Sequence, residues 1–239
     1  MAANGLVDHV PVVVGVLRTL SLSAAKRAQE QGAGALEVRL DLLHDEDRSI
    51  TQISEFIATL HLPVIITNRK REEGGAFIGT EEARIALLRS VLESVEVAAV
   101  DLELTSPEPG KSALVAIASS RQVPVIFSYH DFTGMLPRTE LESIIVRMFD
   151  EGASVAKLAV TPKTLSDALG LLKLTHQLSR EGKRIAVLGM GPVGRHLRVV
   201  APLYGSLLTY GYIEGEAAVA PGQFSVRELT SMLAKLGIT

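Results

Sequence analysis

One lysine of this chain lies in an otherwise apolar segment. Lys157 is flanked by Val155, Ala156, Leu158 and Ala159, a composition typical of a buried β-strand. Burial favours the neutral form of an amine, and a neutral amine attacks a ketone to form a Schiff base. The alternative is a lysine that reaches solvent at a strand end or pairs with a carboxylate. This segment by itself leaves both interpretations open.

A histidine and a glutamate could supply acid–base chemistry beside this amine. His130 ends the preceding β-branched run, so its imidazole and the amine of Lys157 could reach the same centre. The carboxylate of Glu73 could hydrogen-bond the imidazole, fix its tautomer and raise its basicity. The alternatives are a histidine with a structural hydrogen bond and a Glu73-Gly74-Gly75 segment that is only a turn.

Three arginines are candidates for binding an anionic ligand. Arg39, Arg69 and Arg198 carry guanidinium groups, which can bind a carboxylate through two parallel hydrogen bonds. The alternative partners of these arginines are the carboxylates of Glu37, Asp41 and Glu103. Other basic residues of the region are expected to be solvated charges on helices or loops: Lys70, Arg71, Arg84 and Arg89.

Eight short β-branched segments recur along the chain, separated by segments with helical periodicity. Strands that alternate with helices form a parallel sheet, and eight such units predict a closed (β/α)8 TIM barrel. The composition has no break, so we expect residues 1–239 to form a single domain. The predicted strands are 11–17, 35–42, 63–69, 97–104, 123–130, 155–160, 184–190 and 206–213.

Helix boundaries are marked by capping signals. Thr139 to Glu142 and Ser225 to Glu228 have the pattern of a capping box, which predicts that a helix begins at each. Gly152 and Gly237 are expected to end these two helices.

The polar residues of the predicted strands gather near the carboxyl ends of the strands. In a (β/α)8 barrel these ends meet at one mouth, where active sites are built. Buried charges cost several kcal/mol unless they are paired, so a group of them indicates a binding site. We therefore expect Lys157, His130 and the three arginines at one mouth.

The composition excludes several classes of protein. The chain has no cysteine, so it contains neither disulfides nor thiolate ligands. A formal net charge of -3 without a basic cluster argues against binding to nucleic acid. No stretch approaches the ~18 apolar residues that span a bilayer, and the start does not resemble a signal peptide. We expect a soluble, cytoplasmic enzyme.

A glycine motif supports a competing interpretation. Gly189, Gly191 and Gly194 match G-x-G-x-x-G after a predicted strand, and Glu214 follows at the spacing of a dinucleotide site. An NAD(P)-dependent oxidoreductase is therefore the main alternative function. Too few residues follow Glu214 to complete a nucleotide-binding fold, and the same glycines would suit an anion-binding loop of a barrel. A barrel that only binds a ligand is a third interpretation.

Taken together, the residues resemble type I 3-dehydroquinate dehydratase, a Schiff-base enzyme of the shikimate pathway. Each motif is weak alone, but seven in register from residue 37 to residue 223 form a specific match. The motifs are Glu37-Val38-Arg39-Leu40-Asp41, Thr67-Asn68-Arg69 with Glu73-Gly74-Gly75, Asp101-Leu102-Glu103, Ser128-Tyr129-His130-Asp131-Phe132, Lys157-Leu158-Ala159, Arg198 with Gly205-Ser206 and Thr209, and Ala220-Pro221-Gly222-Gln223.

The resemblance implies a (β/α)8 fold, no metal or other cofactor, and commonly a homodimer. It also implies catalytic roles. Lys157 would attack the C3 ketone of 3-dehydroquinate, His130 would remove the C2 proton from the iminium and assist loss of the C1 hydroxyl, and Glu73 would orient His130. Hydrolysis of the imine would release 3-dehydroshikimate.

The resemblance also implies a set of substrate contacts. Glu37, Arg39 and Arg69 would hold the ring hydroxyls. Arg198 would bind the substrate carboxylate, and Gln223 would close over the ligand.

Two positions depart from the family pattern. Val219 and Gly15 stand where the family often has serine, so we expect two hydroxyl contacts to the substrate to be missing. The segment before the first strand is also expected to be too short for the amino-terminal hairpin that often closes the barrel floor.

Overall fold

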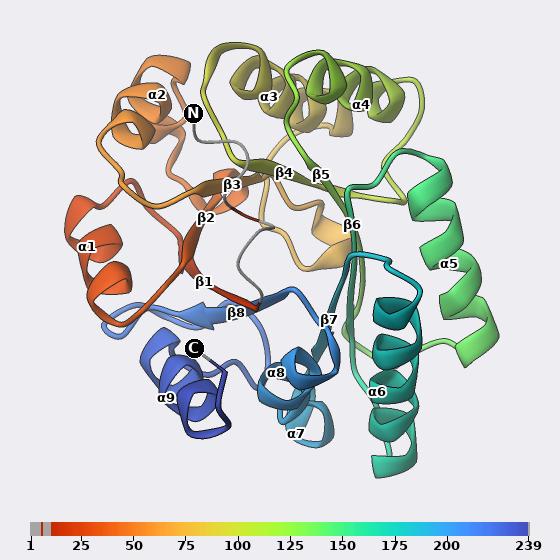
Figure 1. Ribbon diagram of the computed structural model, residues 1–239. Coiled ribbons are helices and arrows are strands. Elements are labelled where there is room, and N and C mark those ends of the chain that lie inside the picture. The colour runs from red at the N-terminus through yellow and green to blue at the C-terminus, as the bar shows by residue number, and fades with distance from the viewer. Residues whose placement is uncertain (1–5, 7–10, 239) are drawn as a thin grey trace.

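A computed structural model of the chain describes residue 6 and residues 11–238. Eight parallel strands form a central barrel, and helices surround its outer face (Figure 1). The predicted (β/α)8 fold is confirmed, and each predicted strand segment overlaps one observed strand. The strands are β1 (Val12–Leu17), β2 (Ala35–Arg39), β3 (Val64–Thr67), β4 (Ala99–Glu103), β5 (Val125–Asp131), β6 (Val155–Val160), β7 (Ile185–Gly189) and β8 (Leu208–Tyr212).

The prediction of one domain over residues 1–239 includes residues 1–5, 7–10 and 239, which lie outside the described residues. The expectation that the segment before β1 is too short for an amino-terminal hairpin concerns mostly the same residues. Of this segment Leu6 is described, and it is buried among residues of the barrel interior.

The barrel closes between β7 and β8 through a short contact. Seven neighbouring pairs, including β1 with β8, form regular parallel ladders, giving the order β7-β6-β5-β4-β3-β2-β1-β8. β7 is joined to the segment just before β8 by an isolated bridge between Ile185 and Ser206. The hydroxyl of Ser206 also accepts a hydrogen bond from the backbone N–H of Val187 at 2.9 Å. A side chain thus replaces part of the backbone ladder where the sheet closes.

Alternation along the strands divides the apolar side chains into two cores. In β1, Val14 and Val16 belong to a cluster inside the barrel, whereas Val13 and Leu17 belong to a cluster between strands and helices. This follows from the two-residue period of a strand, which points successive side chains to opposite faces. The interior cluster is mostly aliphatic, as expected for a chain with only 4% aromatic residues.

Helices connect consecutive strands, with short 3-10 turns in some of the loops. Each packs an apolar face against the barrel, as amphipathic surface helices do. The helices are α1 (Leu22–Glu30), α2 (Ile50–Ala58), α3 (Glu81–Ser94), α4 (Gly110–Ser120), α5 (Arg138–Asp150), α6 (Leu165–Arg180), α7 (Gly191–Gly194), α8 (Leu197–Val200) and α9 (Val226–Lys235). No helix in the described residues is long and apolar enough to cross a membrane.

The capping predictions had different outcomes. The capping box at α9 is confirmed, because Ser225 and Glu228 each accept a hydrogen bond from the other's backbone N–H. The capping box predicted at Thr139 is wrong, because α5 already begins at Arg138 after Pro137 and has no side-chain cap. Thr139 lies within the first turn, whereas a capping side chain must come from the residue just outside the helix.

The predicted helix ends are confirmed. Gly152 follows α5 and Gly237 follows α9, and both have positive φ angles of 102° and 79°. Glycine adopts this left-handed conformation without the steric cost of a Cβ atom.

The glycines of the G-x-G-x-x-G motif serve close packing of the chain. α7 is only four residues long, unlike the long helix of a dinucleotide-binding unit. A Cβ atom on Gly189 would lie 2.1 Å from the carbonyl oxygen of Gly194. The backbone N–H of Gly191 donates to the carbonyl of Pro221, which joins the loops after β7 and β8. Glu214 pairs with Arg227 of α9. The motif is therefore explained without a dinucleotide.

Replacing Gly189 tests this packing. Gly189→Ala should lower the free energy of unfolding by about 1–3 kcal/mol, because the added methyl group meets backbone atoms that cannot rotate away. Gly170→Ala is the matched control: it lies within α6 with nothing near its Cβ position, and should raise stability by roughly 0.5–1 kcal/mol. Urea denaturation measures both. A Gly189→Ala protein as stable as the parent would contradict the packing argument.

Candidate active site

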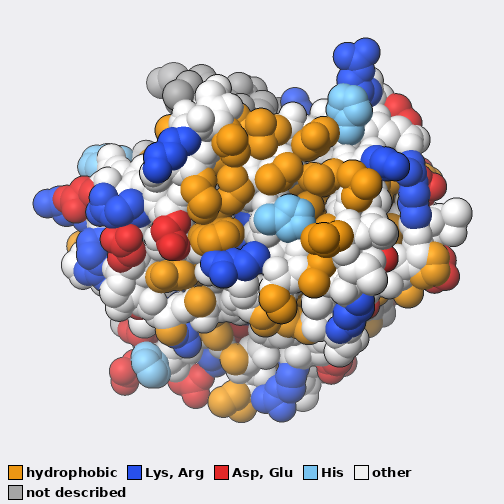
Figure 2. Space-filling model, turned by 90° about the horizontal axis from the view of Figure 1, so that it is seen from below, with side chains coloured by type: hydrophobic (Ala, Val, Ile, Leu, Met, Phe, Trp, Pro, Cys, Tyr) orange, Lys and Arg blue, Asp and Glu red, His pale blue; other side chains and the backbone are white. Residues whose placement is uncertain are grey.

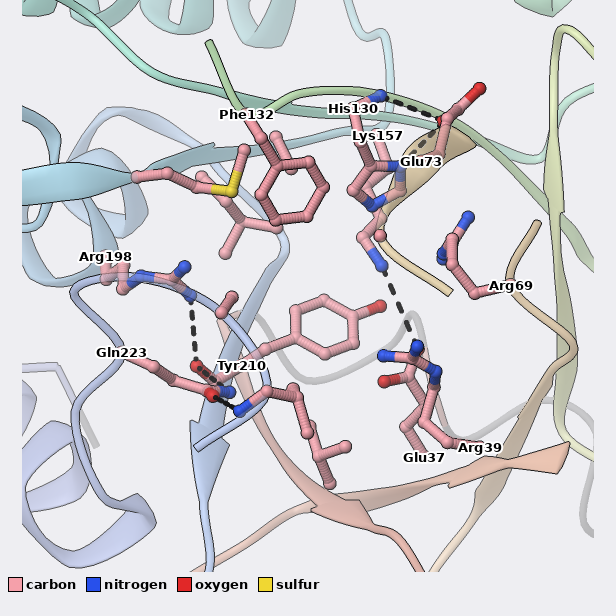
Figure 3. Close-up of a pocket in the computed structure, with 17 residues that line it drawn as sticks. Glu37, Arg39, Arg69, Glu73, His130, Phe132, Lys157, Arg198, Tyr210 and Gln223 are labelled. Atoms are coloured by element: carbon pink, nitrogen blue, oxygen red, sulfur yellow. Dashed lines mark hydrogen bonds and ion pairs between the residues drawn. The ribbon is translucent and has the colours of Figure 1, made fainter. Parts of the chain in front are cut away.

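The carboxyl ends of the strands surround one pocket (Figure 3). It contains about 510 Å³ of empty volume, counting the part open to solvent. This is within the range of small-molecule sites. The structure brings all eight candidate site residues to the wall of this pocket: Glu37, Arg39, Arg69, Glu73, His130, Lys157, Arg198 and Gln223.

Lys157 projects from β6 into the pocket and is only 4% exposed. Its Nζ donates a hydrogen bond to Oδ2 of Asp101 at 2.7 Å and lies 3.9 Å from Oε1 of Glu37. The ring of Tyr210 is on another side, with its centroid 4.0 Å from Nζ. The amine is therefore both buried and paired with carboxylates. The pairing is the alternative that the sequence left open, and the role of Lys157 as a nucleophile stays a prediction.

Arg69 holds the carboxylate that pairs with Lys157. Its guanidinium contacts Asp101 at 2.7 Å, Glu103 at 2.8 Å and the hydroxyl of Ser128 at 2.7 Å. Burial alone would raise the pKa of Asp101, but the cations Arg69 and Lys157 hold this pKa below its usual value. The expected alternative, that Arg69 pairs with protein carboxylates, is therefore what the structure shows.

Arg84 corrects one prediction from the sequence. It was expected to be a solvated charge, but it is 2% exposed and lies 3.0 Å from Glu103 and 2.7 Å from Glu81. The helical period could have predicted that Arg84 is buried, because Arg84 lies four residues before the buried Leu88 and therefore on the same inward face.

Arg39 makes a bidentate pair with Asp41, with distances of 2.8 and 2.7 Å. The carboxylate of Asp41 also accepts hydrogen bonds from the backbone N–H groups of Arg69 and Ala76. Burial raises the pKa of Asp41, but the contact with Arg39 outweighs it, and the pKa lies below its usual value. This pair ties the loop after β3, which carries Glu73, to β2.

His130 and Glu73 form a direct pair. Nδ1 of His130 lies 2.9 Å from Oε2 of Glu73, which also accepts the backbone N–H of His130 at 3.0 Å. Thr105 donates to the other carboxylate oxygen at 2.6 Å. With Nδ1–H donating to an ionised Glu73, Nε2 remains the free acceptor on the imidazole. The pair thus selects the tautomer that a general base requires.

The expectation that Glu73 makes His130 more basic stays a prediction, because the pKa of His130 reflects other groups as well. Burial, together with the nearby cations Arg69 and Lys157, lowers the pKa of His130 well below its usual value. Burial also raises the pKa of Glu73 to about 7. Burial thus shifts both groups toward their neutral forms, and the imidazole is neutral at neutral pH.

Arg198 and Gln223 form the opposite wall of the pocket. Arg198 is 3% exposed, and burial lowers its pKa to about 10. Among the described residues no carboxylate lies within 4 Å of its guanidinium, and its Nε has no hydrogen-bond partner. Nη1 of Arg198 and Nε2 of Gln223 both donate to the backbone carbonyl of Tyr210 at 3.3 Å. An unpaired buried cation is costly, so this wall is suited to an anion.

The sequence reasoning missed several contacts of the site. Tyr210 lines the pocket and contacts the amine of Lys157, and Thr105 bonds Glu73. Strand parity could have found Tyr210, because it lies two residues after Leu208 and both belong to the interior cluster. Thr105 lies in a loop, where no periodic signal exists. Phe132 and Met190 add apolar surface to the wall.

The two departures from the family pattern differ in their consequences. The expectation for Gly15 is wrong, because a Cβ atom there would point away from the pocket, 3.1 Å from Ala28 of α1. Val219 does line the pocket, and its backbone N–H donates to Oε1 of Gln223 at 2.9 Å. A missing hydroxyl contact at Val219 stays a prediction.

No group of three or more potential metal-binding side chains is found within the described part of the chain. The chemistry that the pocket displays is therefore that of an amine, an imidazole paired with a carboxylate, and an unpaired guanidinium. A keto acid is the class of ligand that would engage all three.

The chain is similar to proteins named 3-dehydroquinate dehydratase. One from Methanothrix thermoacetophila is 44% identical over 234 residues, covering 98% of this chain and 96% of the relative. One from Methanosarcina mazei is 40% identical and covers 94% of each chain.

Solved structures agree with this similarity. A 3-dehydroquinate dehydratase from Geobacillus kaustophilus superposes with a TM-score of 0.86 at 26% identity, covering 95% of this chain and 91% of that one. A type I 3-dehydroquinate dehydratase from Clostridium difficile, crystallised with covalently modified comenic acid, has a TM-score of 0.84 at 27% identity and covers 96% and 93%.

A family model described as Type I 3-dehydroquinase matches residues 10–239. This span includes every strand of the barrel and all eight pocket residues predicted from the sequence. The chain therefore belongs to the type I 3-dehydroquinase family.

Proposed function

We propose that this protein dehydrates 3-dehydroquinate to 3-dehydroshikimate in the shikimate pathway, through a covalent imine on Lys157. The observation that carries the proposal is the buried amine of Lys157 next to the His130–Glu73 pair, with the unpaired guanidinium of Arg198 across the same pocket (Figure 3). The substrate carries a ketone, an acidic C–H group beside it and a carboxylate. Each matches one of these groups.

The proposed reaction begins when neutral Lys157 attacks the C3 carbonyl to form a carbinolamine. The carbinolamine hydroxyl takes a proton that comes from solvent and leaves as water, which produces an iminium ion; the final hydrolysis returns this proton. The positive nitrogen withdraws electrons from C2, so that the weak base Nε2 of His130 can remove the C2 proton. The electron pair then expels the C1 hydroxyl, which leaves as water with the proton from His130. Water hydrolyses the conjugated imine and frees the amine and 3-dehydroshikimate.

The remaining pocket residues are proposed to bind and orient the substrate. Arg198 would pair with the carboxylate, and Gln223 would cover the ligand from the loop after β8. Glu37, Arg39 and Arg69 would contact ring hydroxyls with the donor and acceptor positions that their ion pairs leave available. These contacts hold the C2 proton toward His130.

We also propose that residues 1–239 act as one catalytic domain without a cofactor, located in the cytoplasm and assembled as a homodimer. Figure 2 shows hydrophobic side chains gathered on the face that carries α6 to α9. On this face Leu165 and Leu169 of α6 and Leu203 and Tyr204 of the following 3-10 turn (Ala201–Tyr204) are exposed. An apolar patch of this kind supports a protein contact.

Substitution of Lys157 tests the covalent step. Lys157→Ala should reduce turnover below detection, because no other amine can form the imine. Borohydride added with 3-dehydroquinate should leave a stable mass on the Lys157 peptide of the parent protein and none on the variant.

Lys111 provides a matched control, because it is also a buried lysine but lies on α4, where it pairs with Glu151. Lys111→Ala should keep the adduct, and His130→Ala should keep it while losing turnover. An adduct that persists in Lys157→Ala would refute the assignment of the nucleophile.

The raised pKa of Glu73 predicts the pH dependence of the reaction. The carboxylate form of Glu73 selects the active tautomer of His130, so kcat/KM should fall as the pH drops below about 7, the pKa of Glu73. Glu73→Gln should remove this inflection and lower kcat/KM at pH 8 about 10- to 100-fold. Initial rates followed by product absorbance between pH 5 and 9 measure both.

A variant at Thr105 provides a second test of the pH dependence of kcat/KM. Its hydrogen bond lowers the pKa of Glu73, so Thr105→Val should move the inflection to higher pH. An inflection that remains in Glu73→Gln would assign it to another group.

Arg198 should act on binding without supporting the fold. Arg198→Leu should raise KM about 10- to 100-fold, because a charge-assisted contact to the carboxylate is lost in the ground state and the transition state alike. Since the guanidinium has no carboxylate partner among the described residues, stability should not fall.

Arg84→Leu is the contrasting variant, because it removes the partner of Glu81 and one of the two cations that pair with buried Glu103, and it should cost about 1–3 kcal/mol of stability. Urea denaturation and steady-state kinetics separate the two effects. An unchanged KM in Arg198→Leu would count against the carboxylate contact.

A further inference from the structure

Tyr210 lies at the centre of the pocket, between the two walls that the proposed reaction uses (Figure 3). Its backbone carbonyl accepts hydrogen bonds from both Arg198 and Gln223 at 3.3 Å. Its ring faces the other way, with the amine of Lys157 4.0 Å from the ring centroid. A keto acid that contacts both Arg198 and Lys157 would therefore lie against Tyr210.

The hydroxyl of Tyr210 is a buried donor without a partner. The residue is 4% exposed, and its Oη has no hydrogen-bond partner among the described residues. Nearly all buried polar groups in folded proteins are hydrogen-bonded, so an unpaired phenol in a ligand pocket indicates a contact made on binding. Burial, with the carboxylates of Glu37 and Asp101, raises the pKa of Tyr210 well above 10. The phenol therefore stays protonated and can donate.

Three carboxylate oxygens near Tyr210 already accept hydrogen bonds from other residues. Oε1 of Glu37 accepts a hydrogen bond from Thr67 at 2.7 Å. The two carboxylate oxygens of Asp101 accept from Arg69 and from Lys157. These same carboxylates disfavour a second anion beside the phenol, so the acceptor that suits the hydroxyl of Tyr210 is an uncharged oxygen.

We propose that Tyr210 is a positioning residue whose hydroxyl donates a hydrogen bond to an uncharged substrate oxygen beside the imine, and whose ring face stabilises the cationic nitrogen. The inference rests on the imine proposed above. In that imine the iminium nitrogen is Nζ itself, so the contact between Nζ and the ring lies where the positive charge must be held. An aromatic face attracts a cation but gives little to a neutral amine, which favours the iminium.

Two substitutions separate the two roles. Tyr210→Phe keeps the ring and removes only the hydroxyl, so kcat/KM should fall about 3- to 10-fold, the value of one neutral hydrogen bond. Its stability should be unchanged or higher, because an unpaired buried group is removed. Tyr210→Leu also removes the ring, and should lower kcat/KM further, by about 3- to 10-fold.

The fraction of enzyme trapped by borohydride at saturating 3-dehydroquinate reports on the ring. It should remain as in the parent protein for Tyr210→Phe and decrease for Tyr210→Leu. Tyr212→Phe is the matched control, since it makes the same chemical change two residues along β8 at a side chain that does not line the pocket. It should leave kcat/KM unchanged.

The outcomes distinguish this inference from the proposed function. If the parent protein forms no adduct, the imine itself is refuted. If the parent forms the adduct and Tyr210→Phe retains kcat/KM within threefold, the hydroxyl role is refuted and the imine stands. A loss of activity in Tyr210→Phe that is matched by a loss of stability would assign the hydroxyl to the fold, and would also overturn the proposal.

Discussion

A chain of ion pairs crosses the carboxyl end of the barrel, and every charge in it is buried. It runs from Arg84 through Glu103, Arg69 and Asp101 to Lys157. Removing such groups from water costs several kcal/mol each, and the mutual attraction of alternating charges offsets that cost only with close geometry. The position of Lys157 therefore depends on all the strands that contribute a charge. The same network holds the amine of Lys157 in the pocket that His130 also lines.

Charge balance differs between the two sides of the pocket. On one side the cations Arg69 and Lys157 are matched by carboxylates. On the other side Arg198 has no acidic partner among the described residues. A bound carboxylate would complete the charges there. In the proposed reaction this charge distribution would orient the ligand, with its anionic end toward Arg198 and its ketone toward Lys157.

The acid–base pair shows how burial changes the properties of familiar groups. Desolvation lowers the pKa of His130 and raises the pKa of Glu73, so both shift toward the neutral form. A neutral imidazole is a weak base, and it can serve only if the proton that it removes is unusually acidic. In the proposed reaction iminium formation would supply that acidity, so the pocket and the covalent step would depend on each other.

The residue types and their order were enough to predict the barrel, because parallel strands and crossover helices follow from local periodicity. The same reasoning brought Lys157, His130 and Glu73 to one mouth, since strand ends converge in this fold. It did not predict that α5 begins at Arg138. Pro137 and the capping-box pattern at Thr139 are competing signals for the start of this helix, and the sequence does not decide between them.

Tertiary structure alone decided which charges are paired. The helical period places Arg84 on the inward face of α3, but only the fold brings Glu103 of β4 opposite it as a partner. Gly15 precedes Val16, which lines the pocket, but a Cβ atom at Gly15 would point toward the helices. The partners of a side chain come from distant segments, and no local pattern encodes them. The sequence therefore determined the fold and the kinds of groups at its mouth, and packing decided their contacts, their charge states and which of them remain available to a ligand.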